Sequence, residues 1–197
     1  MNNNKKTFAL TIFILLVVSL FILLGIPNNP TVQTEQYDNI NIPIFLHPIR
    51  DSGELTSTRS NENILSLFSK TQNIWDQANI VFDVNLKEIT LNENQINNIL
   101  SDNYYPFYNS IENNGIHVFF INNLKGANGV AISPSIALVA DITTVNDFRA
   151  TAHEIGHLLG IKHSQDINNL LFQGANGIIL SREDVYISRY HSSRFNN

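Results

Sequence analysis

The stretch from His153 to His163 constrains this chain of 197 residues more than any other, because its fixed positions have separate mechanical tasks. It reads H-E-x-x-H-x-x-G-x-x-H. His153 and His157 are four residues apart, so on a helix they project from the same face and can share one ion. Gly160 tolerates a positive φ, which lets the helix end and the chain reverse, so that His163 approaches the same ion from off the helix.

This spacing indicates a catalytic metal centre. Three imidazoles leave a fourth coordination position open, which is the arrangement of a catalytic zinc, whereas structural zinc sites close with four protein ligands. Glu154 lies beside the ligands and can reach a metal-bound water without being a ligand, as a general base must. We therefore predict His153, His157 and His163 as ligands of one catalytic Zn²⁺ and Glu154 as the base. The competing interpretation is a helix whose histidines only pack or cap.

At this point the chain resembles a known family. The motif is similar to the extended zinc-binding consensus of the metzincin metalloproteases, and Ser164 directly after the third His resembles the matrixin branch. The segment 74–82 is similar to the part of matrixins where the first helix runs into the second strand. The resemblance covers about residues 40–190, with its specific portion at 153–164. It implies a zinc endopeptidase of the α+β class, with a twisted mixed five-stranded sheet, three main helices and a small C-terminal subdomain.

The chain departs from the family in two respects. Metzincins carry a Met in a tight turn below the zinc, but the only Met of this chain is Met1. Leu171, eight residues after the third His, is the expected replacement, and because its volume is close to that of Met the exchange should cost less than about 1.5 kcal/mol. We therefore expect activity to survive. The chain has no Cys, which excludes latency through a cysteine bound to the zinc. The calcium and structural-zinc sites of the family have no matching residues here.

The resemblance also implies how a substrate binds. Residues 129–133 match the antiparallel edge strand that lines the cleft, and an exposed edge can pair with an extended peptide. An ordinary edge strand ended by Pro134 is the alternative. Residues 173–177 would form the outer wall of the pocket for the side chain after the scissile bond, with a hydrophobic preference. The implied substrate-binding residues are Gly129, Val130, Ala131, Leu171 and Phe172.

The amino terminus predicts a membrane segment. Lys5 and Lys6 precede an uncharged apolar run over residues 7–26, whose 20 residues span about 30 Å as a helix. Residues 1–27 are thus a signal-anchor or a signal peptide. The length of the run and the lack of a clear cleavage site favour an uncleaved anchor. The lysines orient everything after it outside the cytoplasm. Residues 28–39 form a polar tether, and the protein is membrane-anchored with an extracytoplasmic catalytic domain, or secreted if the segment is cleaved.

Residues 40–197 are predicted as one protease domain, acting as a monomer on a polypeptide substrate. The net charge of −5 and the scattered basic residues give no nucleic-acid surface. Pro43 places the first strand at an edge or a bulge, and His47 ends that strand in a loop. His117 is a satisfied sheet residue and Trp75 a core residue. The expected strands are 40–46, 80–86, 116–121, 129–133 and 136–142; the expected helices are 60–79, 92–103, 145–159 (capped through Thr144 and Asp147) and 182–190 (capped through Ser181 and Asp184).

Two other functions compete with hydrolysis. A catalytically silent, membrane-tethered binding module that keeps the zinc fold is motivated by the missing Met and the lack of a latency device. Against it, the base and all three ligands are intact. A thermolysin-like site with Glu183 as third ligand is weaker, because Glu183 lies in the capping signal of a later helix and His163 already completes the shorter motif.

Overall fold

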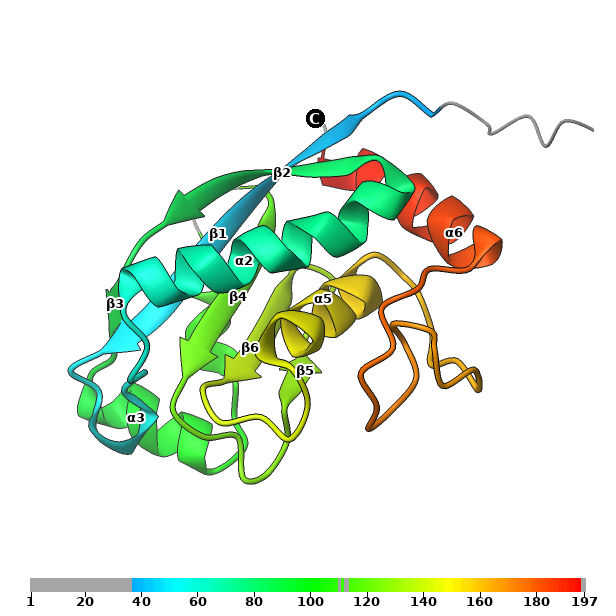
Figure 1. Ribbon diagram of the computed structural model, residues 1–197. Helices are drawn as coiled ribbons and strands as arrows, with labels where there is room; N and C mark the ends of the chain where they lie inside the picture. Colours follow the sequence, from blue (N-terminus) through cyan, green and yellow to red (C-terminus); the bar gives the residue numbers. More distant parts are fainter. Residues whose placement is uncertain (1–36, 110, 112–113, 196–197) are drawn as a thin grey trace, which may run out of the picture. The chain divides into compact units, whose positions relative to one another are not determined.

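A six-stranded mixed sheet organises residues 37–109, 111 and 114–195, which are the part of the chain that the computed structural model describes (Figure 1). Five strands follow the order β2-β1-β4-β6-β5, and the two-residue β3 pairs with the end of β1. All pairings are parallel except that of β5 with β6. The strands are β1 (Ile40–Arg50), β2 (Ile80–Leu86), β3 (Ile89–Thr90), β4 (Ile116–Ile121), β5 (Gly129–Ala131) and β6 (Ile136–Ala140).

The predicted α+β class with a mixed sheet is confirmed, and β3 adds a short sixth strand to the five that were expected. The predicted membrane segment and most of the tether lie outside the described residues. Within the described part, no helix has the length and apolar character that crossing a membrane requires.

Helix α2 (Asn61–Trp75) connects β1 to β2 and covers one face of the sheet. It begins where the Ser60 side chain accepts a hydrogen bond from the Asn63 N–H at 3.2 Å, which satisfies one of the free donors of the first turn. It ends four residues earlier than predicted, because a 3-10 turn at 76–78 leads to Asn79 in the left-handed region (φ 51°). That residue reverses the chain into β2.

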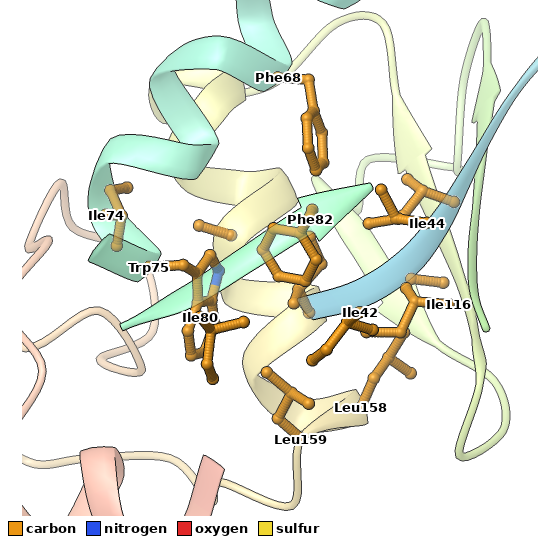
Figure 2. Packing of buried hydrophobic residues seen from close by; sticks show 14 of the residues in the cluster. Ile42, Ile44, Phe68, Ile74, Trp75, Ile80, Phe82, Ile116, Leu158 and Leu159 are labelled. Carbon is orange, nitrogen blue, oxygen red and sulfur yellow. The ribbon is translucent and has the colours of Figure 1, made fainter. Parts of the chain in front are cut away.

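Two hydrophobic cores lie on opposite faces of the sheet, because successive strand residues alternate between the faces. Helices α2 and α5 (Asp147–Leu158) pack on the larger core. Figure 2 shows Trp75 of α2, which is fully buried as predicted, among strand residues such as Ile42 and Ile80. Helices α3 (Glu93–Leu100) and α4 (Tyr105–Tyr108) contribute to the smaller core. Phe107 of α4 is fully buried there, with its ring centroid 4.6 Å from that of Phe119.

The capping signal at the last helix is confirmed. Helix α6 (Arg182–Ser192) begins at Ser181, whose hydroxyl accepts from the Asp184 N–H at 3.1 Å while the Asp184 carboxylate accepts from the Ser181 N–H at 2.8 Å. A capping box of the same kind, between Asn92 and Gln95, opens α3.

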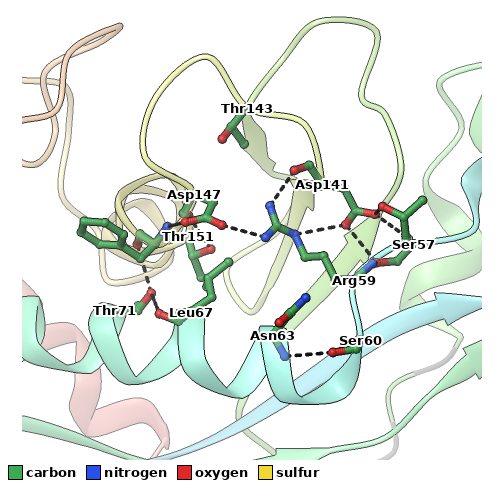
Figure 3. Close-up of polar contacts among 12 residues, drawn as sticks. Ser57, Arg59, Ser60, Asn63, Leu67, Thr71, Asp141, Thr143, Asp147 and Thr151 are labelled. Atoms are coloured by element: carbon green, nitrogen blue, oxygen red, sulfur yellow. Dashed lines mark hydrogen bonds and ion pairs between the residues drawn. The ribbon is translucent and has the colours of Figure 1, made fainter.

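The predicted cap at the start of the zinc helix is wrong. The N-cap residue of α5 is Asn146, whose side chain forms no capping bond, and the Asp147 carboxylate accepts from the Phe148 N–H at 2.8 Å instead. Thr144 instead donates from its N–H to the Asn128 side-chain oxygen at 2.7 Å, next to β5. Asp147 pairs with Arg59, whose guanidinium also lies 3.3 Å from the Asp141 carboxylate (Figure 3). This network ties the loop before α2 to the start of α5, so tertiary contacts determine where the zinc helix begins.

The predictions for His47 and Pro43 are also wrong. Strand β1 continues to Arg50, and His47 is a buried strand residue whose Nε2 lies 3.0 Å from Nδ1 of His117 on β4. His117 is a satisfied sheet residue, as predicted. β1 is an interior strand, flanked by β2 and β4. Pro43 is tolerated there because β4 joins β1 only from Ile44 onward.

Candidate active site

Helix α5 places two of the predicted ligands one turn apart on one face. The ring centroids of His153 and His157 are 4.7 Å apart, and their Nε2 atoms are separated by 3.2 Å. The helix contacts α2 on one side and strands β5 and β6 on another, and His153 is 6 % exposed. The packing of α5 therefore fixes the first two imidazoles next to the edge strand of the sheet.

The third imidazole arrives from outside the helix, and Gly160 makes this possible. Gly160 has φ +83°, a conformation that favours glycine. The turn is closed by the Ile161 N–H, which donates to the Gly156 carbonyl at 2.9 Å. The reversal brings Nε2 of His163 to 3.1 Å from Nε2 of His157. A side chain at position 160 would also collide with His191 of α6, since an added Cβ would lie 2.4 Å from its Cδ2.

The three imidazoles fit a zinc ion. Their ligand atoms all lie within 4.8 Å of one another, and in the described part of the chain no other group of His, Cys, Asp or Glu side chains is arranged to hold a metal. Zinc binds imidazole nitrogen at about 2.0–2.1 Å, so two nitrogens of a tetrahedral site are about 3.3 Å apart. The printed separations of 3.1 and 3.2 Å are close to that value.

Hydrogen bonds select the ring tautomer that binding requires. Nδ1 of His153 donates to the Leu170 carbonyl at 2.8 Å, and Nδ1 of His157 donates to the Ile161 carbonyl at 2.9 Å. The lone pair of each neutral ring is then on Nε2, which faces the other two imidazoles. Burial lowers the pKa of His153 to about 4 and also lowers that of His157. Both rings are therefore neutral near pH 7 and able to bind a cation.

Glu154 lies between the imidazoles and the edge strand. An added Cβ on Gly129 of β5 would be 2.6 Å from Cγ of Glu154, so the glycine makes room for the carboxylate. Burial raises the pKa of Glu154 to about 7, while a hydrogen bond from the Ala131 N–H and the charge of Arg149 act in the opposite direction. A carboxylate that titrates near neutrality is suited to accept and return a proton.

Strand β5 leaves one edge of the sheet open. The Ile132 N–H donates to the Ile136 carbonyl and the Ala140 N–H donates to the Asn128 carbonyl, so residues 128, 130 and 132 face β6. Because the main-chain groups of an antiparallel strand alternate in direction, those of Gly129 and Ala131 face away from the sheet. The hydrogen bond from Ala131 to Glu154 agrees with this direction.

An open cavity of about 720 Å³ joins these parts. It is lined by residues 129–134, the three imidazoles, Glu154 and Gln173, and by two residues from the C-terminal end of the chain, His191 and Arg194. Arg194 donates to the carbonyls of Pro134 (2.7 Å) and Leu158, which connects the end of α6 to both walls of the cleft. A cation at the last carbonyls of a helix is also favourable for the helix dipole.

Leu171, the expected replacement for the missing Met, packs against the zinc helix. It is fully buried, and an added Cβ on Gly156 of α5 would lie 3.1 Å from its Cδ2. Its own N–H donates to the side-chain oxygen of Asn169 at 2.7 Å, and Asn169 is held by Asp184 at 2.6 Å. Phe172 is half-buried beside it and does not line the cavity described above. Glu183, the alternative third ligand, lies on α6 and is not part of the metal group.

Sequence reasoning missed four residues at this site. All four lie outside the motif, and most of them are far apart in the chain. They are Arg149, Asn169, His191 and Arg194, and their convergence depends on the path of residues 164–181. One signal was available for Arg149. It precedes His153 by four residues, which places a charged residue on the ligand-bearing face of the helix.

Comparison with known families identifies the chain. The family model described as matrixin matches residues 67–187, more than half of the 197 residues. The chain is a matrixin. Together with the imidazole triad, this makes it a zinc metalloendopeptidase, as the motif predicted. No curated protein matches this matrixin in sequence.

Solved structures share its fold. Archaemetzincin from Methanopyrus kandleri has 13 % identity and a TM-score of 0.59, over 78 % of this matrixin and 96 % of the archaemetzincin chain. Metalloproteinase-II from Bacteroides fragilis has 14 % identity and a TM-score of 0.53, over 80 % and 55 % of the two chains. A chain from the structure of a chaperone-substrate complex has 15 % identity and a TM-score of 0.52, over 82 % and 36 %. The matrixin thus spans about half and about a third of the last two chains. At such identities the likeness concerns the fold alone.

Proposed function

We propose that this matrixin hydrolyses peptide bonds of polypeptides outside the cytoplasm, with His153, His157 and His163 holding one zinc ion and Glu154 acting as general base. The observation that carries the proposal is the convergence of three Nε2 atoms and one buried carboxylate in a single open cavity beside an unpaired strand edge. Such a set of groups serves hydrolysis, since a purely structural zinc site has no need of a carboxylate base or an open cleft.

Glu154 is the group that moves the proton. A zinc ion held by the three imidazoles supplies a Lewis acid that polarises the scissile carbonyl and lowers the pKa of water towards neutrality. The Glu154 carboxylate accepts a proton from the attacking water and later delivers it to the leaving amine. Burial raises the pKa of this carboxylate in the metal-free protein, which favours its taking up a proton. The bonds of Nδ1 to backbone carbonyls hold the imidazoles in place during these steps.

The open edge of β5 binds the substrate main chain. Gly129 presents its N–H and C=O groups and Ala131 its C=O group to the cleft, while the Ala131 N–H is bonded to Glu154, and an extended peptide can pair with the free groups as an additional strand. The main-chain groups of Val130 face β6, and its side chain packs against the smaller core. Residues 173–177 form the pocket wall, of which Gln173 lines the cavity, and Leu171 and Phe172 lead into it.

The location of the protein is part of the proposal. The uncharged run at residues 7–26 with Lys5 and Lys6 before it supports a membrane anchor, with the protease domain on the extracytoplasmic side. Fractionation of cells that produce the full-length protein, followed by protease protection of the membrane fraction, tests this arrangement. A catalytic domain protected on the cytoplasmic side contradicts it.

The catalytic assignment is tested with three forms of the full-length protein purified in mild detergent: wild type, Glu154→Gln, and Glu183→Gln as a matched carboxylate control. We expect wild type with equimolar zinc to cleave casein, and a chelator to abolish cleavage. Glu154→Gln should lose about 10²- to 10⁴-fold in rate, which is the usual contribution of a general base. It should retain zinc, and Glu183→Gln should cleave normally.

Two outcomes contradict the assignment. A Glu154→Gln protein that cleaves as fast as wild type excludes Glu154 as the base. A wild-type protein that is folded, holds zinc and cleaves neither casein nor other unfolded chains favours the binding module instead.

A further inference from the structure

A buried arginine lies directly behind the metal ligands. Arg149 is 3 % exposed and precedes His153 by one turn of α5. Among the ion pairs formed by the described residues none includes Arg149, and the carboxylate of Glu154 acts on it only through its charge, although a buried cation without a bonded carboxylate is costly. Its guanidinium must therefore be compensated by other acceptors.

Those acceptors are backbone carbonyls of one segment. Nη2 of Arg149 donates to the carbonyl of Leu170 at 2.6 Å and to that of Phe172, and Nε donates to that of Gly177 at 3.3 Å. These carbonyls belong to both ends of the stretch 170–177, which includes Leu171 and the expected pocket wall. A planar guanidinium can hold several acceptors in a fixed relative position, and few side chains share this ability.

The same carbonyl connects the arginine to a metal ligand. The Leu170 carbonyl accepts from Nη2 of Arg149 and from Nδ1 of His153, at 2.6 and 2.8 Å. The carbonyl that orients the His153 ring is thus itself positioned by the guanidinium. Movement of the segment at Leu170 would change the direction of the imidazole and of its Nε2.

Other hydrogen bonds also hold this segment, among them those from the Ser164 N–H to the Leu171 carbonyl at 3.1 Å and from the Phe172 N–H to the Asn169 carbonyl at 3.2 Å. The Leu170 N–H donates to the Ile179 carbonyl, and Asn169 accepts from the Leu171 N–H. Leu171 packs against Gly156, where a branched Leu replaces the unbranched Met that the family carries. Hydrogen bonds from Arg149 thus hold the turn in addition to apolar packing.

We propose that Arg149 is a positioning residue that clamps the segment 170–177 to α5, and through the Leu170 carbonyl aligns His153 for zinc while fixing the pocket wall. The inference rests on the proposed function, since it concerns the zinc ligands and the substrate pocket of that site. It adds a residue outside the motif on which metal affinity and side-chain selection both depend.

The chain offers a matched control for a merely structural arginine. Arg189 also donates only to backbone carbonyls, those of Ala78 at 2.7 Å and Asp38 at 2.9 Å, and lies away from the metal group. Replacing either arginine by Met removes hydrogen bonds from a guanidinium to backbone carbonyls, although those of Arg189 are more exposed than those of Arg149. If Arg149 were only structural, the two variants would differ in stability alone.

The test uses the full-length wild type, Arg149→Met, Arg149→Lys and Arg189→Met at a temperature where all four are folded. Zinc affinity is measured by competition with a chromophoric chelator. Amide hydrogen exchange of peptides covering 164–180 is measured in the metal-free proteins. For cleavage, kcat and KM are compared on peptides that differ in the residue after the scissile bond.

We expect Arg149→Met to lower zinc affinity by about 10- to 100-fold, as loss of a group that orients a metal ligand does. Exchange in 164–180 should become faster, and the ratio of kcat/KM between peptides with large and small apolar residues should move towards one. Arg149→Lys should be intermediate, because an ammonium cannot hold three carbonyls. Arg189→Met should leave zinc affinity, selectivity and exchange in 164–180 unchanged.

The inference is overturned if Arg149→Met has wild-type zinc affinity and unchanged exchange in 164–180. A variant Arg149→Lys that equals wild type in every respect also overturns it, since charge alone would then suffice. Cleavage is not needed for either decision. If wild type cleaves nothing, the proposed function fails, while zinc affinity and exchange still test Arg149.

Discussion

Lowering the pH should destabilise this fold through His47. Its side chain is 3 % exposed in β1, with Nδ1 bonded to the Lys87 carbonyl at 3.1 Å and Nε2 to His117. Burial lowers its pKa from 6.5 to about 4; the Lys87 carbonyl bond acts in the opposite direction, and the charges of His117 and Lys87 lower the pKa further. At mildly acidic pH, His47 is therefore protonated in the unfolded chain but stays neutral in the native protein.

The size of the effect follows from linkage. With pKa values of 6.5 unfolded and about 4 native, the contribution of His47 is complete above about pH 6.5, falls by about 2 kcal/mol at about pH 5 and by about 3 kcal/mol at about pH 4. Folding lowers the pKa of this histidine, so the free energy of unfolding decreases as the pH falls through the window between the two pKa values. His153 and His157 add losses of the same sign in the metal-free protein.

The assay compares wild type with His47→Gln, a non-titrating side chain that can still form hydrogen bonds. Urea unfolding at a series of pH values, with a chelator present, gives the free energy of unfolding of each protein. The difference between the two curves cancels the contributions of the other histidines. His47→Gln should be less stable at about pH 7.5 and should lose about 2 kcal/mol less than wild type on acidification to about pH 5. Parallel curves for the two proteins would refute the reasoning.

Three further substitutions test the site and its support. Gly129→Ala should displace the Glu154 carboxylate and lower kcat by at least about tenfold, since small misplacements of a catalytic group are costly. Steady-state kinetics at unchanged zinc content test this, and a kcat equal to that of wild type contradicts it. Gly160→Ala combines a strained φ with a collision against His191 and should lower zinc affinity, measured by chelator competition. Asp141→Asn removes the carboxylate charge beside the half-buried guanidinium of Arg59 and should cost about 2 kcal/mol in urea unfolding. Unchanged stability would show that the ion pair is dispensable.

The zinc ligands and much of the fold could be predicted because their determinants are local. The three imidazoles are separated by ten residues at most, and the turn at Gly160 is a property of that residue. Helix α2 was predicted from its apolar spacing and α6 from its capping box, both of which act within a few residues.

The predictions failed where contacts between distant segments of the chain determine the local structure. His47 looked like a strand terminator, but its pairing with His117 on a strand 70 residues away extends β1 and buries the ring. Thr144 carried a local capping signal, yet Asn128 competes for its N–H. Arg149 could be placed on a helix face, but its acceptors lie on a segment whose path no local pattern predicts.

The brevity of β5 determines which proteins can be cut. An edge of three residues spans about 10 Å of extended chain, so it can align only a short stretch of main chain that is already free of its own secondary structure. We therefore expect selection by local unfolding: tails, linkers and denatured chains enter the cleft, while well-folded proteins are spared. The same shortness leaves little edge on which a second sheet could grow, which protects the protease itself from aggregation.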